Sequence, residues 1–372
     1  MRIFHLIHSE GVYGAELILL YLAREQQRAG HEPLIGSIRD PGTPQTPFEA
    51  RVAEWRLPLV PIRIAPRPTP GVIRKLLRAI SEHKPDVLHS HGYKADILLG
   101  PLPRRVRGPM LATLHGWTGG HLFGRKWLYE SLDRLALRRL DSVVVVTRSM
   151  LLLPALRRIK EARRRVVENG IPPLADRMVD VGSTVLPGTL VNFTMRSPTL
   201  VAIGRLSVEK GFNQLLEAFA RARAEGGSRH QLLIVGEGPE RARLAGRIEA
   251  LGLREVVLLA GYVQGPDRLL AEASGFVMSS FREGMPLVLL EAMQWRVPIL
   301  ATAVGAIPEI LDAGRYGRLV APNDLGALTE GLRAMMSVDS DEHVNAAHRV
   351  VSEHLTSERM CRDYLAAYEA IA

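Results

Sequence analysis

Short apolar runs of strand length alternate along the chain with longer segments in which apolar residues recur at helical spacing. The first example is a strand-like run at residues 2–8, a glycine-containing turn, and a helical pattern at residues 17–30. Later strand-like runs end in polar turns and read PLIGSI, PDVLHSHG, MLATLHG and SVVVVTRS. This alternation predicts an α/β protein whose parallel sheets are covered by helices on both faces. Ligands bind such sheets outside the carboxyl ends of the strands, so we expect the polar turns to carry the function.

The length of the chain predicts two domains. A chain of 372 residues exceeds what one ordinary core organises. The segment 167–198 is rich in Pro, Gly, Ser and Asp and has no sustained period, which is typical of a linker. We therefore expect a boundary near residue 175, with one α/β domain at 1–175 and a second that begins at 176.

The most informative segment reads EGMPLVLLE and lies at residues 283–291. Glu283 precedes a Gly-X-Pro turn, and the apolar run from Leu287 has helical spacing, so Glu291 belongs to the first turns of a helix. The amides of such a turn and the positive end of the helix hold anionic groups, while a carboxylate hydrogen-bonds to sugar or ribose hydroxyls. The segment therefore favours a sugar-nucleotide site. Two solvated glutamates without a function are the alternative, because short motifs also match by chance.

A second segment, TLVAIGRLSVEKGFNQLLEAF from Thr199, has the strand–turn–helix layout of a phosphate site. Arg205 can hold phosphate oxygens with two parallel hydrogen bonds, and Lys210 adds a point charge on the same turn. Gly204 permits a close approach of the backbone. A third strand and turn, HQLLIVGEGPE, contains Gly236 and is a weak signal when taken alone. The alternative for Arg205 and Lys210 is that they are ordinary surface cations.

The net charge of +9 conceals an uneven distribution of charge along the chain. Residues 1–165 contain 28 Lys and Arg against 14 Asp and Glu, whereas the remaining residues contain 20 against 25. Basic clusters with apolar residues at helical spacing lie at 71–84, 103–108 and 156–166. Such stretches suit an anionic membrane surface, a lipid-linked phosphate or nucleic acid. Solvated, arginine-rich helix faces are the alternative.

Composition disfavours several classes of protein. No apolar run approaches the ~20 residues that cross a bilayer, and MRIFHLIH lacks the long apolar stretch and cleavage site of a signal peptide. Cys361 is the single cysteine, which excludes an internal disulfide and a cysteine-rich metal site. An aromatic content of 5%, without a zinc-finger or RNP-like motif, argues against nucleic acid as a partner. We therefore expect a cytoplasmic protein.

Taken in order, the segments GRLSVEKG, IVGEGPE, FREGMPLVLLEAM, PILATAVGAIPEIL and GRLVAPND make the chain resemble the retaining group 1 glycosyltransferases of the GT-B fold. The resemblance is close over residues 199–335 and looser in SEGVYGAE, DVLHSHG, TLHGW and VENGI. It implies an acceptor-side Rossmann-like domain at 1–175, a nucleotide-sugar-binding Rossmann-like domain at 176–355, and a last helix at 356–372 that returns to the first domain. It also implies transfer of a hexosyl or N-acetylhexosaminyl group from a nucleoside diphosphate sugar to a hydroxyl, with retained configuration.

The resemblance further implies roles for individual residues. The implied catalytic residues are Arg205, Lys210, Glu283 and His115. The implied donor-binding residues are Gly14, Gly204, Gly236, Gly284, Met285, Leu287 and Glu291, of which Glu291 would hold the ribose hydroxyls. The loop at Gly14 reads GVYGAE where many relatives have adjacent glycines, which is a departure from the family pattern. No metal or other cofactor is implied, because the cations of the chain would balance the charge of the diphosphate.

Some polar residues can be explained by a structural role alone. His89 and His91 stand at alternate positions of a strand, as a pair of metal ligands would, but no third ligand cluster accompanies them in the sequence, so we interpret them as cleft-edge or packing residues. Asp339 and Asp341 form an Asp-X-Asp far from the donor motifs, and we expect them to cap a helix or face solvent. A histidine at the end of a strand, such as His115, is often structural.

Other functions are left open by the sequence. A GT-B-type sugar-nucleotide epimerase or phosphorylase would share the architecture, and a non-catalytic nucleotide-sugar-binding partner protein would share the motifs. The joint presence of two cations and two acids argues against loss of chemistry. The acceptor is unknown; as a hypothesis it is lipid-linked or a growing surface polysaccharide, with the protein peripheral on the inner face of the membrane. The aromatic and basic segment 116–135 is the candidate for acceptor or membrane docking, with a core helix as the alternative.

Overall fold

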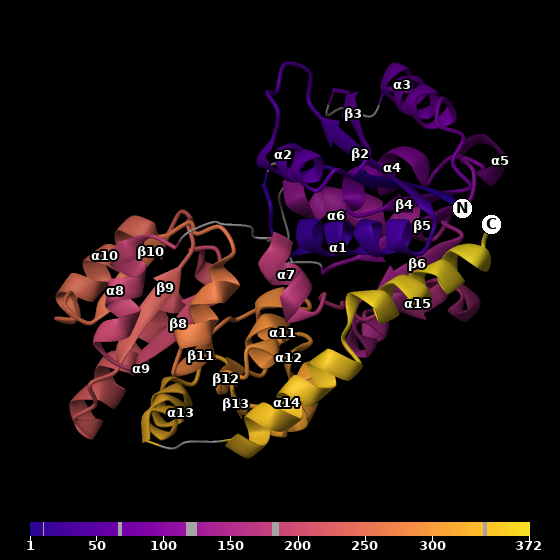
Figure 1. The fold of residues 1–372 in the computed structure, drawn as a ribbon. Helices are drawn as coiled ribbons and strands as arrows, with labels where there is room; N and C mark the ends of the chain where they lie inside the picture. Colours follow the sequence, from indigo (N-terminus) through magenta and orange to yellow (C-terminus); the bar gives the residue numbers. More distant parts are fainter. Residues whose placement is uncertain (10, 66–68, 117–124, 181–185, 338–340) are drawn as a thin grey trace. The chain divides into compact units, whose positions relative to one another are not determined.

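The chain forms two compact units, each built around a parallel sheet (Figure 1). The computed structural model describes all residues except 10, 66–68, 117–124, 181–185 and 338–340. The first unit comprises Met1–Pro172 and Leu355–Ala372, and the second comprises Pro173–His354. The predicted α/β class with two Rossmann-like sheets is therefore confirmed.

The first unit contains a seven-stranded sheet in the order β3-β2-β1-β4-β5-β6-β7. Its strands are β1 (Arg2–Ile7), β2 (Glu32–Arg39), β3 (Leu59–Arg63), β4 (Val87–Ser90), β5 (Met110–Leu114), β6 (Ser142–Val145) and β7 (Arg164–Val166). Its helices are α1 (Gly14–Arg28), α2 (Pro47–Glu54), α3 (Pro70–Ser81), α4 (Tyr93–Leu99), α5 (Arg104–Arg107), α6 (Arg125–Leu137) and α15 (Ser357–Glu369), with short 3-10 turns η1 (Arg148–Leu152), η2 (Leu156–Arg158) and η3 (Glu161–Arg163). Strands such as β6 are apolar on both faces because helices cover both sides of the sheet.

The last helix, α15, belongs to the first unit and packs on α1. Its start is fixed at Thr356, whose hydroxyl accepts a hydrogen bond from the Arg359 amide at 3.2 Å. Gly170 lies against the same point, because a Cβ at Gly170 would approach the Thr356 carbonyl oxygen to 2.0 Å. The helix buries Tyr364 and Tyr368 in the unit, and both side chains reach polar groups there.

The second unit contains a six-stranded sheet in the order β10-β9-β8-β11-β12-β13. Its strands are β8 (Thr199–Ile203), β9 (Gln231–Val235), β10 (Val257–Gly261), β11 (Gly275–Met278), β12 (Ile299–Thr302) and β13 (Arg318–Val320). Its helices are α7 (Leu174–Asp180), α8 (Gly188–Arg196), α9 (Phe212–Gly226), α10 (Arg241–Ala250), α11 (Leu287–Gln294), α12 (Ile307–Ile310), α13 (Leu325–Ser337) and α14 (Asp341–Glu353), with 3-10 turns η4 (Val208–Lys210), η5 (Pro266–Glu272) and η6 (Asp312–Gly314). The strand order reverses between β8 and β11, which is where open α/β sheets bind ligands.

Two local expectations are wrong. The segment 167–198, interpreted as an irregular linker, contains α7 and α8, and α8 is stabilised by burial of Leu190 and Phe193 despite its weak periodicity. The basic segment 156–166, interpreted as helically spaced, forms two 3-10 turns and the edge strand β7, because pairing with β6 satisfies its backbone. Asp339, Trp117 and Phe123, which the sequence singles out, lie outside the described residues.

Candidate functional site

Two turns of the second unit are joined where β8 and β11 pair in the sheet. The turn after β8 carries Lys210, and the loop after β11 carries Glu283. The Phe281 amide donates to the Glu209 carbonyl at 2.7 Å, and the Ser279 hydroxyl donates to the Lys210 carbonyl at 3.0 Å. These bonds fix a cation and an acid at the point where the strand order reverses, which is the expected location of a ligand.

The Lys210 ammonium and the Glu283 carboxylate form a direct ion pair. Lys210 Nζ lies 2.6 Å from Glu283 Oε1, and the Ser280 hydroxyl donates to the same oxygen at 2.5 Å. The side chains are 22% and 9% exposed, so the pair is largely but not fully withdrawn from water. An ammonium has three N–H donors, of which Glu283 occupies one. The remaining donors of Lys210 can therefore reach an anionic ligand without breaking the pair.

Arg205 is a second cation on the same turn and is exposed. Within the part of the chain that the structure describes, its guanidinium forms no salt bridge. The pKa of Glu209, between the two cations in sequence, is lowered: burial acts to raise it, but hydrogen bonds and the charges of Arg205 and Lys210 outweigh burial. The turn thus offers one solvent-facing guanidinium that is ready for a bidentate contact with phosphate.

Glycine contacts hold these turns together. Gly236 after β9 has a φ of 142°, and a Cβ there would lie 2.0 Å from the Gly204 carbonyl oxygen. Gly305 after β12 has a φ of 55°, and a Cβ there would lie 2.0 Å from the Glu283 carbonyl oxygen. The Ala306 amide donates to the Gly284 carbonyl at 3.1 Å. The turns after β8, β9, β11 and β12 are therefore in backbone contact, which only residues without a side chain permit.

Glu291 lies on α11, the helix that follows the Glu283 loop. It belongs to a second cluster of charged residues, separate from the Lys210–Glu283 pair. It is 7% exposed, and its Oε1 lies 3.2 Å from Arg177 Nη2. Arg177 also pairs with Asp267 and donates to Gln294 Oε1 at 2.6 Å. Burial raises the pKa of Glu291 to about 7, with Arg177 opposing the shift and Asp267 adding to it. A carboxyl group in this state changes charge near neutral pH.

We expect the free energy of unfolding to depend on pH because of the buried Glu291 carboxyl group. Because the folded-state pKa of Glu291 is raised, its contribution to stability is present below the unfolded value of 4.5 and is lost as pH rises through about 7. Glu291→Gln removes this term, so the loss of stability between pH 5 and pH 8, measured by urea unfolding, should be smaller than in the wild type. The exposed Glu255→Gln serves as the control. An identical pH dependence in all three proteins would contradict the raised pKa.

The sequence missed Arg177, which holds Glu291 in place. Arg177 is 3% exposed and lies on α7, inside the segment interpreted as a linker. A charged residue in a short helix without clear periodicity carries no signal of burial. Of the residues that the sequence singled out near the turn, Gly284 lies in the loop, Met285 is buried, and Leu287 starts α11.

In the first unit, Gly14 is the first residue of α1, and His115 directly follows β5. His89 and His91 have a third histidine beside them, so the expectation that none accompanies this pair is wrong. His5 on β1 places its ligand atom within 4.8 Å of theirs. The sequence could not indicate this, because β1 and β4 are neighbours only in the folded sheet. Ring nitrogens of His5, His89 and His91 all have hydrogen-bonding partners, so we interpret the group as a hydrogen-bonded network.

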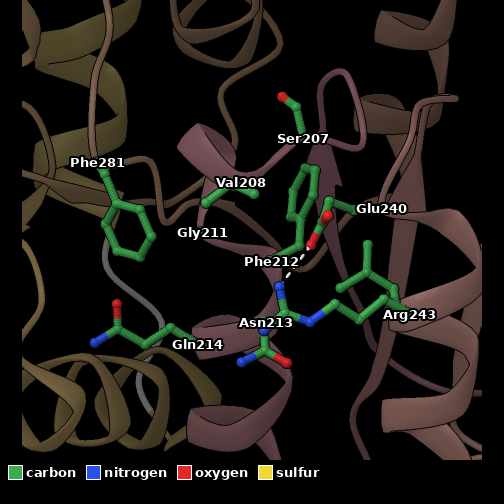
Figure 2. Close-up of a pocket in the computed structure, with 10 residues that line it drawn as sticks. Ser207, Val208, Gly211, Phe212, Asn213, Gln214, Glu240, Arg243 and Phe281 are labelled. Atoms are coloured by element: carbon green, nitrogen blue, oxygen red, sulfur yellow. Dashed lines mark hydrogen bonds and ion pairs between the residues drawn. The ribbon is translucent and has the colours of Figure 1, made fainter. Parts of the chain in front are cut away.

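A pocket of about 140 Å³, partly open to solvent, adjoins the Lys210 turn. It is lined by Ser207, Val208, Gly211, Phe212, Asn213, Gln214, Glu240, Arg243, Leu244 and Phe281. Figure 2 shows Phe281 and Gln214 on one side and the Glu240–Arg243 ion pair, 3.0 Å, on the other. None of the proposed catalytic residues of this unit lines it, so this pocket is distinct from the Lys210–Glu283 pair.

Sequence comparisons place the chain among glycosyltransferases. The family profile described as glycosyl transferases group 1 matches residues 197–337, and the profile of glycosyltransferase family 4 matches residues 12–173. The putative colanic acid biosynthesis glycosyltransferase WcaL of Escherichia coli is 33% identical over 151 residues, which span 38% of this chain and 37% of that protein. The 2-deoxystreptamine N-acetyl-D-glucosaminyltransferase of Streptomyces fradiae is 26% identical over 90% of this chain and 85% of its own length.

Solved structures share the fold over the whole chain. HepE of Anabaena in complex with UDP and glucose superposes with a TM-score of 0.81 at 19% identity, covering 100% of both chains. The TarM protein of S. aureus has a TM-score of 0.78 at 12% identity, covering 99% of both chains. The two parallel-sheet units are therefore those of the GT-B fold.

Proposed function

Because the chain belongs to the group 1 glycosyltransferases, we propose that it transfers a hexosyl or N-acetylhexosaminyl group from a nucleoside diphosphate sugar to a hydroxyl acceptor. The observation that carries this proposal is the Lys210–Glu283 pair at the β8/β11 reversal, on the same turn as the exposed Arg205. The relatives support it, since one is named an N-acetyl-D-glucosaminyltransferase and one structural neighbour holds UDP and glucose.

The proposed reaction breaks the bond between the anomeric carbon and the β-phosphate oxygen. Negative charge develops on the β-phosphate, so preorganised cations aimed at that oxygen give the largest help. Lys210 and Arg205 are placed on one turn for this task, and Glu283 with Ser280 orients the ammonium. The acceptor hydroxyl attacks the anomeric carbon from the face that the diphosphate leaves, and its proton passes to the leaving phosphate. Configuration is then retained without a carboxylate nucleophile.

Metal independence is part of this proposal. Two cations of the chain supply the charge that a divalent metal supplies in other transferases.

Glu291 and Arg177 are proposed to contact the ribose, with Glu291 as the hydrogen-bond acceptor for its hydroxyls. In the first unit, Gly14 at the start of α1 is proposed to bring backbone amides to the diphosphate.

A panel of nucleotide sugars tests the function. The chain is incubated with each donor and with a mixture of hydroxyl acceptors in the presence of EDTA, and products are identified by mass spectrometry. Diphosphate release together with a glycoside is the expected result. An epimerised donor or a sugar phosphate would identify an epimerase or a phosphorylase instead, and a requirement for added divalent metal would overturn metal independence.

We further propose that the acceptor is lipid-linked or a surface polysaccharide and that the first unit docks on an anionic membrane. Among the described residues, no helix is both long and apolar enough to cross a bilayer. On α6, however, four large apolar side chains are 37–55% exposed: Trp127, Leu128, Leu132 and Leu135. The last three follow one face of the helix. The Escherichia coli relative, named a putative colanic acid biosynthesis glycosyltransferase, supports the polysaccharide class.

Liposome co-sedimentation tests the docking. We expect binding to vesicles that contain anionic lipid, with a several-fold loss in the double variant Leu128→Glu/Leu135→Glu, which removes apolar contacts and adds like charge. The variant Val191→Glu, at an exposed apolar residue of the second unit, is the control. Binding that is independent of anionic lipid, or equal in both variants, would contradict the proposal.

A further inference from the structure

A chain of buried polar side chains runs from α1 to the residue that follows β5. Gln26 Oε1 lies 2.8 Å from His5 Nε2, and His5 Nδ1 lies 3.0 Å from His91 Nε2. His91 Nδ1 in turn lies 3.4 Å from His115 Nε2. Gln26 and His5 are fully buried, and His91 is 6% exposed. Four elements of the first unit, α1, β1 and the ends of β4 and β5, thus contribute to one line of contacts that ends at His115.

The three imidazoles in this row of contacts, those of His5, His91 and His115, are neutral at physiological pH. Burial lowers the pKa of His5 and of His115 to about 4. Burial and the neighbouring histidines lower the pKa of His91 well below its ordinary value. A neutral imidazole has one N–H donor and one acceptor nitrogen. When such rings are joined in a row, the direction of the first hydrogen bond therefore fixes the direction of every later one.

Gln26 sets that direction. Its carbonyl oxygen can only accept, so His5 Nε2 carries the proton and His5 Nδ1 is the acceptor. His91 Nε2 then donates to His5, which leaves His91 Nδ1 as the acceptor for His115 Nε2–H. The outcome is one tautomer of His115, with the proton on Nε2 and a lone pair on Nδ1. In the described part of the chain, no hydrogen bond satisfies that Nδ1.

The C-terminal helix holds Gln26 in this orientation. The Gln26 amide nitrogen donates to the Tyr368 hydroxyl at 3.2 Å, while the amide oxygen faces His5. The Tyr368 hydroxyl oxygen lies 2.7 Å from His89 Nδ1, and His89 Nε2 lies 2.7 Å from the Thr113 hydroxyl oxygen. This second branch ends at Tyr364, 2.9 Å from Thr113, and does not touch His115.

We infer that Gln26, His5 and His91 are positioning residues that fix His115 as the neutral Nε2–H tautomer and present its Nδ1 as a hydrogen-bond acceptor. The consequence for catalysis rests on the proposed function: a hydroxyl of the bound substrates would donate to Nδ1, and the site would hold no imidazolium beside the anomeric centre. His91 and His5 do not touch the substrates in this account and act only through His115.

NMR of the intact protein labelled with ¹⁵N-histidine tests the inference directly. The nitrogen shifts and their couplings to ring protons identify the tautomer of each of the 12 histidines, and the His115 signals are assigned by their absence in His115→Gln. We expect a single Nε2–H tautomer for His115 between pH 6 and 8. A mixture of tautomers, an Nδ1–H tautomer or a protonated ring in the wild type would overturn the inference without any variant.

The variant Gln26→Met removes the acceptor while it nearly keeps the shape of the side chain. His5 is then free to reverse, and we expect His115 to populate both tautomers. Tyr364→Phe, which removes one buried hydroxyl from the other branch, should leave His115 unchanged and controls for general loosening. Retention of the single tautomer in Gln26→Met would also overturn the inference.

Activity separates this inference from the proposed function. In glycosyl transfer, Gln26→Met should lower turnover by about tenfold, as lost orientation of a histidine commonly does, and Tyr364→Phe should stay near the wild type. If the tautomer changes in Gln26→Met but turnover does not, the network acts as inferred and it is the role of His115 in the reaction that fails.

Discussion

Replacing Lys210 by alanine is expected to lower the turnover of glycosyl transfer by about 10²–10³-fold while the protein stays folded. The ammonium lies on the turn after β8, held 2.6 Å from Glu283, where it can meet the charge that develops on the departing phosphate. Lys210 is the one lysine between residues 173 and 354, in a region that otherwise uses arginine for every cation. We propose that this position needs a compact ammonium with three rotatable donors.

Steady-state kinetics with the active donor measures the effect, and thermal unfolding checks the fold. Lys210→Arg keeps the charge but not the compact geometry, so we expect it to recover only part of the turnover. Arg221→Ala on α9, which removes an exposed cation paired with Glu217, should behave like the wild type. Wild-type turnover in Lys210→Ala would remove the ammonium from the mechanism.

The second large effect is expected on stability, from Arg177→Met. Its side chain is 4% exposed, and its guanidinium pairs with two buried carboxyl groups, those of Asp267 and Glu291. Removal of one partner from a buried ionic cluster leaves uncompensated charge and costs about 3–5 kcal/mol of the free energy of unfolding. The affinity for nucleoside diphosphate should fall as well, because Glu291 loses the group that orients it.

Urea unfolding at two pH values tests this explanation. Without Arg177 the pKa of Glu291 rises further, so protonation of Glu291 removes its negative charge at low pH, and the deficit of Arg177→Met should be smaller at pH 5 than at pH 8. Arg254→Met, which removes an exposed partner of Glu249, is the matched control and should change stability by less than about 1 kcal/mol. A deficit under about 1 kcal/mol for Arg177→Met would mean that the cluster does not stabilise the second unit.

The strands and the turns that follow them could be predicted because their signals are local. The run that begins at Thr199 continues with four apolar residues, as expected for a strand covered on both faces, and it ends in a turn with charged residues and glycine. Once two such strands pair as neighbours, the residues after them meet. The pairing of Lys210 with Glu283, 73 positions apart, follows from this topology.

Other parts of the candidate site depend on contacts that no local pattern reveals. Arg177 is buried by residues about 90 and 114 positions away, yet its own segment reads as an irregular linker. His5 joins His91 only because β1 and β4 are adjacent, and Tyr368 enters the network because the last helix packs on α1. Buried polar residues of this kind depend on hydrogen-bonding and ionic partners that are distant in the sequence. Their neighbours in the sequence therefore carry little information about them.

The central claim is that the turns of the second unit bind the diphosphate of a nucleotide sugar, and a crystal structure of the chain with its nucleoside diphosphate tests it most directly. The account predicts phosphate oxygens within hydrogen-bonding distance of both the Arg205 guanidinium and the Lys210 ammonium, with the ribose hydroxyls on Glu291. A diphosphate bound away from the turns after β8 and β11, with Lys210 still paired only to Glu283, would contradict it.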